Sequence, residues 1–158
     1  MSTPGAETTP VERVRELLER VTEAFGLPAD VRVEESGDGI LGVLEGDDLG
    51  LFIGRHGQTI DAVQHLAFKV ANRDLRRESG IRVTVDAAGY RARREQLLQR
   101  QADQAALDAL SGGRPVALDA MSATERKVVH EYLKDRGDVE TYSEGTEPDR
   151  HLVVAPLR

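Results

Sequence analysis

The sequence predicts an α+β fold in which two small domains are joined by a long helix. Two β-like runs flank the turn signal Ser36-Gly37-Asp38-Gly39, and a glycine-bounded loop at residues 54–57 separates two segments with helical spacing. A helical pattern from Tyr90 to Ser111 then leads into a compact last third. With 158 residues and 39% hydrophobic composition, the chain is long enough for one domain or for two modest cores.

The first predicted element is a helix that begins after Thr9 and ends near Gly26. Thr9-Pro10-Val11-Glu12 has the pattern of a capping box with proline at the first helical position. The apolar positions predict its buried side: Val11, Val14, Leu17, Leu18, Val21 and Phe25. The other side carries Glu12, Glu16, Glu19 and Glu23, and such an acidic side is unsuited to contact with nucleic acid.

Two strands, a short helix, a longer helix and a third strand follow in that order. The hairpin turn at residues 36–39 joins the first two strands. The third strand is predicted by the alternation of Ile81, Val83 and Val85. The predicted segments are Val31–Glu35, Ile40–Glu45, a short helix from about Asp47, a longer helix that ends at Asn72, and Ile81–Asp86.

The last third contains a long helix followed by a small unit of alternating strands and helix. The helix at residues 90–111 is stopped by Gly112-Gly113 and is about 33 Å long. Ser122-Ala123-Thr124-Glu125 is a second capping box, and the helix it begins is expected to bury Val128, Val129, Tyr132 and Leu133. The predicted strands are Arg114–Leu118, Val139–Tyr142 and His151–Ala155.

These elements predict three segments of the chain. Residues 1–9 are small and polar and are expected to be a disordered tail. Residues 10–88 form the first domain, and residues 89–158 form the second domain together with the connecting helix at 90–111.

The loop Gly54-Arg55-His56-Gly57, with Gln58 after it, is the first candidate binding site. Glycine allows sharp turns and close backbone approach, and the N-terminus of the following helix favours an anion. The pattern therefore fits a clamp for a phosphate backbone. The alternative is a helix C-cap followed by a turn, because about 1.4 such matches are expected by chance. A second match, Gly39–Gly42, lies in a β-like run and is assigned to a strand.

The charge is distributed unevenly along the chain. The net charge is −7, yet residues 54–102 carry ten basic and five acidic side chains. The flanking blocks, 1–53 and 103–158, have net charges of −8 and −4. A local basic block favours a polyanion, and the alternative is a solvated helix face. The expected supporting basic patch consists of Arg73, Arg76, Arg77, Arg91, Arg93 and Arg94.

The second candidate site is Arg126 and His130, with Lys127 beside them. Their i, i+4 spacing places Arg126 and His130 on one side of a helix. A guanidinium and an imidazole can together hold one phosphate. The alternative is a surface arginine beside a histidine that caps or packs locally.

Several classes of function are disfavoured by residues that the sequence lacks. There is no cysteine, which excludes disulfides and thiolate metal sites and fits a reducing cytoplasm. No apolar run is long enough to span a bilayer, and no signal peptide opens the chain, so no membrane insertion is expected. The four histidines lack metal-ligand spacing and no nucleophile motif is present, so we expect no catalytic residues, metal or cofactor.

The order of these motifs resembles a known combination of domains. Helix, two strands, short helix, glycine loop, helix and strand resemble a type II KH domain. The last third resembles the nucleic-acid-binding domain named for its Arg-x-x-x-His signature. Together, over about residues 10–157, they resemble the bacterial Jag family, also called KhpB. The most specific matches are Gly50–Ala62 around the loop and Val139–Gly145 in the second domain.

The resemblance implies a fold, a function and partners. It implies a three-stranded sheet packed by helices in the first domain and a small sheet packed by helices in the second. It also implies a cytoplasmic protein that binds single-stranded RNA as an RNA chaperone or post-transcriptional regulator, with a link to cell-wall or cell-elongation control. Single-stranded DNA is an alternative ligand of the second domain. The implied protein partner is a small single-KH-domain protein, and a homodimer is the alternative.

One departure from the family concerns its N-terminal region. Many members carry an additional N-terminal Jag domain and a long linker, whereas this sequence begins almost directly at the first KH helix, so a short form is expected. A second hypothesis for the whole chain is a protein-interaction module, acting through KH-mediated dimerisation or as a scaffold, with incidental RNA contact. The acidic first helix and the net charge of −7 favour it.

Overall fold

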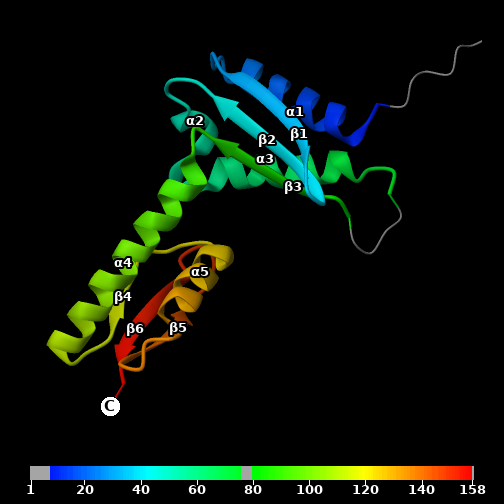
Figure 1. The fold of residues 1–158 in the computed structure, drawn as a ribbon. Helices are drawn as coiled ribbons and strands as arrows, with labels where there is room; N and C mark the ends of the chain where they lie inside the picture. Colours follow the sequence, from blue (N-terminus) through cyan, green and yellow to red (C-terminus); the bar gives the residue numbers. More distant parts are fainter. Residues whose placement is uncertain (1–7, 76–79, 158) are drawn as a thin grey trace, which may run out of the picture. The chain divides into compact units, whose positions relative to one another are not determined.

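The structure, a computed structural model, describes residues 8–75 and 80–157. The chain forms two compact units, Met1–Arg91 and Ala92–Arg158 (Figure 1). Two predictions fall wholly or partly outside the described residues. They are the disordered tail, of which only Thr8 and Thr9 are described, and the basic residues Arg76 and Arg77.

The first unit has the order of elements that the type II KH resemblance implies. A helix and two strands precede a short helix, a tight 3-10 turn, a longer helix and a third strand. The elements are α1 (Pro10–Ala24), β1 (Asp30–Ser36), β2 (Gly39–Glu45), α2 (Gly50–Ile53), the turn Arg55–Gly57, α3 (Gln58–Ala71) and β3 (Arg82–Ala87). The predicted order is confirmed.

The start of α1 is stabilised by the predicted capping box. The Thr9 hydroxyl accepts a hydrogen bond from the Glu12 backbone N–H at 3.2 Å, and the Glu12 carboxylate accepts one from the Thr9 N–H at 2.7 Å. Hydrogen bonds from Thr9 to the Glu12 carboxylate, above all from the Thr9 backbone N–H, hold the pKa of Glu12 below its ordinary value, because they stabilise the charged carboxylate. Val14 and Leu18 face the core, and the acidic side is exposed as expected.

The first sheet has the strand order β1-β2-β3. β1 and β2 form an antiparallel hairpin in which Ser36 pairs with Gly39, and the turn residue Gly37 has φ 60°. β2 and β3 are parallel. Gly39 and Gly42 lie in β2, which confirms that this G-x-x-G match is a strand. A Cβ on Gly42 would lie 2.7 Å from the Leu18 side chain, so this glycine lets α1 pack closely on the sheet.

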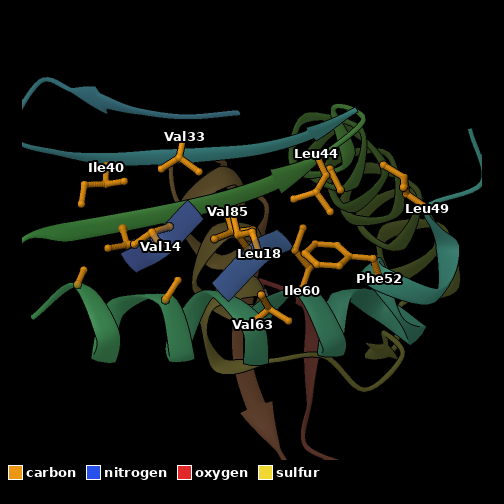
Figure 2. Close-up of a cluster of buried hydrophobic side chains, with 14 residues drawn as sticks. Val14, Leu18, Val33, Ile40, Leu44, Leu49, Phe52, Ile60, Val63 and Val85 are labelled. Carbon is orange, nitrogen blue, oxygen red and sulfur yellow. The ribbon is translucent and has the colours of Figure 1, made fainter. Parts of the chain in front are cut away.

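The core of the first unit lies between the sheet and the helices (Figure 2). Figure 2 shows Ile60 and Val63 on the side of α3 that faces the strand residue Val85. Ile60 has no exposed surface and Val63 is 4% exposed, so both belong to the core. Ile53 is half-buried against the same cluster.

The second unit packs two helices on one face of a small sheet. Its elements are α4 (Tyr90–Gly112), β4 (Val116–Ala117), α5 (Ala123–Leu133), β5 (Val139–Glu144) and β6 (His151–Pro156). The first two residues of α4 belong to the first unit. The strand order is β4-β6-β5, with antiparallel neighbours. Leu152 and Val154 of β6 share a core with Leu98 of α4 and with Val129 and Leu133 of α5.

The buried side of α5 differs from the predicted one. The capping box of Ser122 and Glu125 is confirmed, but the side that faces the core is formed by Arg126, Val129 and Leu133. Tyr132 is 41% exposed, so the prediction that it packs inward is wrong. Its hydroxyl donates to Asp103 at 2.9 Å, and this hydrogen bond raises the pKa of the phenol.

None of the helices in the described part of the chain combines the length and the apolar character needed to cross a membrane.

The two neighbouring apolar residues of α2 give a test of this packing. Phe52 is fully buried and Leu51 is 61% exposed. Replacing Phe52 by Ala removes a core side chain and should lower the free energy of unfolding by about 3–5 kcal/mol. Leu51→Ala, the matched control, should change it by less than about 0.5 kcal/mol. Urea denaturation measures both, and equal losses would contradict the assigned core.

Candidate nucleic-acid interface

The loop between α2 and α3 has a backbone conformation that requires glycine. Gly54 has φ 74° and ψ 176°, and Gly57 has φ 76° and ψ 14°. The first conformation is essentially restricted to glycine, and the second is left-handed. Between them, His56 is also left-handed, with φ 53° and ψ 26°. Histidine is among the residues that enter this region more readily than most.

Neither glycine has space for a side chain. A Cβ on Gly54 would lie 2.2 Å from the Thr59 hydroxyl oxygen and 2.9 Å from the Thr59 backbone nitrogen. A Cβ on Gly57 would lie 2.7 Å from the Tyr90 hydroxyl oxygen and 2.9 Å from its ring. The loop backbone is therefore packed directly against the start of α3 and against Tyr90.

The polar side chains of the loop face solvent. Arg55, His56 and Gln58 are exposed, whereas Gly57 is buried. Among the residues that the structure describes, no carboxylate pairs with Arg55 or His56. No side chain caps the N-terminus of α3, which begins at Gln58. A positively polarised helix end beside an exposed arginine favours a bound anion.

The predicted basic patch does not form one uniform cationic surface. Arg73 is exposed and lies 3.6 Å from Asp74. Arg91 is bound to Asp61, and Arg94 forms an ion pair with Glu125 in which both side chains are 15% exposed. Arg93 is exposed and also has an interaction partner. The guanidinium groups of Arg91 and Arg94 thus already have carboxylate partners.

Arg126 is buried inside the second unit. Its side chain is 9% exposed, and its guanidinium donates to the Met121 carbonyl at 2.7 Å and to Glu147 at 2.7 Å. A longer contact of 3.4 Å joins it to the Arg150 carbonyl. Arg126 therefore connects the start of α5 to the segment before it and to the loop between β5 and β6.

The other two members of this candidate site face outward. Lys127 and His130 are exposed on α5. Nδ1 of His130 lies 2.5 Å from the Thr141 hydroxyl of β5. Although Arg126 and His130 are separated by one helical turn, the arginine is bonded inside the unit and only the histidine presents its ring to solvent.

Lys127 also lines a groove between α4 and α5, within the second unit. The groove has a volume of about 450 Å³. Its lining residues are Glu95, Gln99, Thr124, Lys127, Val128, Glu131 and Tyr132. Carboxylates and a lysine share its rim, so the groove has mixed charge.

Several residues around these sites were not singled out from the sequence. Thr59 and Tyr90 pack against the loop glycines, Glu147 holds Arg126, and Thr141 bonds His130. Their roles depend on contacts between distant segments, and no local sequence signal marks such contacts. Within residues 8–75 and 80–157, no group of His, Asp and Glu side chains has the arrangement of a metal site.

Comparison with known protein families identifies both units. The model of the KhpA/KhpB KH domain matches residues 15–85, and the model of the Arg-x-x-x-His domain matches residues 96–156. The chain is thus a protein with one KH domain and one Arg-x-x-x-His domain. Both domain families are non-enzymatic, as expected for this chain.

Three relatives match the chain over most of its length, which includes both domains. The chain is 35% identical to the RNA-binding protein KhpB of Clostridium symbiosum, 35% identical to that of Lactiplantibacillus plantarum and 32% identical to that of Bacillus subtilis. The alignments cover 93%, 96% and 94% of this chain, and 66%, 46% and 72% of the respective relatives. The chain belongs to the KhpB family.

The burial of Arg126 predicts a structural role that a stability measurement can test. Arg126→Met leaves the Met121 carbonyl and Glu147 without their donor and should lower the free energy of unfolding of the second unit by about 1–3 kcal/mol. Lys127→Met, next to it and exposed, should change it by less than about 0.5 kcal/mol. Amide hydrogen exchange in β6, combined with thermal unfolding, reports on this unit. Equal stability of the two variants would show that the guanidinium contacts contribute nothing to the fold.

Proposed function

We propose that this chain binds single-stranded RNA by holding the phosphate backbone at the Gly54–Gln58 loop and at a second point on the Arg-x-x-x-His domain. The observation that carries this proposal is the loop itself. Its glycines pack the loop backbone against Thr59 and Tyr90, and Arg55 and His56 are exposed without carboxylate partners among the described residues. KH domains hold the backbone of about four nucleotides at such a loop. The family assignment and the names of the relatives, which are RNA-binding proteins, support RNA as the ligand.

Each residue of the loop has a distinct part in this proposal. Gly54 and Gly57 allow the tight turn that packs the loop against Thr59 and Tyr90 and leaves the side chains between them exposed. The Arg55 guanidinium, the His56 ring and the Gln58 amide are the donors to phosphate oxygens. These donors recognise the backbone and not the base edges, so the sequence preference is loose.

The second point of contact consists of Lys127 and His130, supported by Arg126. The exposed lysine and histidine are the direct phosphate donors. Arg126 holds α5 and the β5–β6 loop in place through Met121 and Glu147. Two weak sites on one strand raise the apparent affinity, because the second contact forms within an existing complex. Single-stranded DNA is the alternative ligand at this point.

The family resemblance extends the proposal to a cellular role. We place the chain in the cytoplasm as an RNA chaperone or post-transcriptional regulator connected to cell-wall or cell-elongation control. A small single-KH-domain protein is its proposed protein partner, and a homodimer is the alternative.

A protein-interaction module is a second candidate function, and one observation favours it. Leu51 on α2 and Leu66 on α3 are 61% and 50% exposed. Exposed apolar side chains of this size favour a protein contact if they form a continuous patch. A partner that co-purifies after nuclease treatment, together with no RNA crosslinking in cells, would favour this function over RNA binding.

The loop can be tested by reversing its charge. Replacing Arg55 and His56 by Asp should weaken RNA binding about tenfold or more, because two phosphate donors become two repelling carboxylates. With three to five phosphate contacts, log K for the unmodified chain should fall against log[salt] with a slope of about −2 to −3.5. Loss of two contacts should reduce the magnitude of this slope by about 1.4. Fluorescence anisotropy with a labelled single-stranded RNA measures both quantities.

The matched control changes charge elsewhere on the same domain. Arg20 and Arg32 are 75% and 70% exposed and belong to α1 and β1. Replacing both by Asp makes the domain more acidic than the loop variant does, yet it should weaken binding much less. If the control variant loses as much affinity as the loop variant, net charge and not the loop determines binding.

A further inference from the structure

We propose that Tyr90 and Arg91, the first two residues of α4, are positioning residues for the glycine loop. This inference rests on the proposed RNA-binding function of that loop. The sequence suggested a direct contact between the Arg91 charge and nucleic acid, whereas the contacts of its guanidinium give it a different role.

The side chain of Tyr90 fills the space beside Gly57. Its side chain is half-buried and packs against the core of the first unit. A Cβ on Gly57 would lie 2.7, 2.9 and 3.1 Å from the Tyr90 atoms Oη, Cε1 and Cζ. The ring thus supports the loop backbone from the inside, at the residue that immediately precedes α3. A smaller side chain at position 90 would remove this contact with the loop backbone.

Arg91 joins three elements with one side chain. Its Nε donates to the Val85 carbonyl of β3 at 2.7 Å, and Nη2 donates to Gln64 of α3 at 3.0 Å. Nη1 donates to Asp61 of α3 at 3.1 Å. Gln64 in turn accepts from the Val85 N–H at 2.9 Å. These bonds fix the first turn of α4 to the first two turns of α3 and to β3.

The backbone of Arg91 adds a further connection. Its N–H donates to Oδ1 of Asp86 at 3.2 Å, and the same oxygen accepts from the Ala87 N–H at 2.8 Å. The turn between β3 and α4 is therefore held by Asp86 while the side chain of Arg91 reaches α3. Tyr90 and Arg91 reach opposite ends of one short segment, because Gly57 immediately precedes α3 and Asp61 lies in its first turn.

The bonds of the Arg91 guanidinium distinguish positioning from direct binding. Three of its nitrogen atoms are bonded within the domain, and its side chain is 32% exposed. A rigid loop loses less conformational freedom when RNA binds, so contacts that hold the loop strengthen binding without touching the ligand. A direct contact predicts the opposite response to loss of Asp61, since a released Arg91 is free to approach phosphate.

The test removes the carboxylate partner of Arg91. Asp61→Ala should weaken binding of a labelled single-stranded RNA by about threefold to tenfold, even though the domain becomes less acidic. Glu19→Ala removes the same charge from the exposed side of α1 and should leave affinity unchanged or slightly higher. Tighter binding by the Asp61→Ala variant would overturn the proposal and assign Arg91 to direct phosphate contact.

A second measurement reads the loop without RNA. Tyr90→Ala should accelerate amide hydrogen exchange at residues 54–58 and weaken RNA binding. Tyr90→Phe keeps the ring, so this variant should retain slow exchange and most of the affinity. Unchanged loop exchange in Tyr90→Ala would overturn the role of Tyr90. If replacing Arg55 and His56 by Asp leaves RNA binding unchanged, the proposed function itself fails. The hydrogen-exchange measurement needs no RNA, so it still shows whether Tyr90 positions the loop.

Discussion

The candidate site of the KH domain depends on the lack of space for a side chain at Gly54 and at Gly57. Gly54 lies against Thr59 and Gly57 lies against Tyr90, and a Cβ at either position would overlap those neighbours. The positive φ angles of both residues add a conformational reason for glycine. Because the chain turns so tightly here, the side chains of Arg55 and His56 face solvent. The helix that follows, α3, packs into the core with Ile60. The same constraint therefore shapes the site and the packing behind it.

The arginines of this protein fall into two groups, those available to a ligand and those that form ion pairs within their own domain. Arg55 is exposed with no carboxylate partner in the described part of the chain, whereas Arg91, Arg94 and Arg126 donate to acidic side chains of their own domain. The net charge of residues 54–102 therefore overstates the positive charge available to a ligand. Charged side chains that are bound to one another still organise a site, since they fix the helices and loops that carry the exposed donors.

Local patterns predicted most of the fold. Both capping boxes, the hairpin turn and the order of helices and strands follow from residues close together in the sequence. Predictions about side-chain direction on α5 were less successful, because the sheet and α4 select which side of that helix is buried. A long polar residue such as Arg126 was not expected inside, and Tyr132 was expected there. For the site, the loop residues were visible in the sequence, whereas Tyr90 and Asp61 were not, because their roles arise from contacts across 30 or more residues.

The central claim is that the Gly54–Gln58 loop holds the RNA backbone, and nuclear magnetic resonance tests it most directly. Unlabelled single-stranded RNA is titrated into the ¹⁵N-labelled chain, and the backbone amide signals are followed. The account predicts that the largest early shifts occur at residues 54–60, with a second group on α5 around Lys127 and His130. Shifts confined to α1 and the β1–β2 hairpin, with the loop signals unchanged, would contradict it.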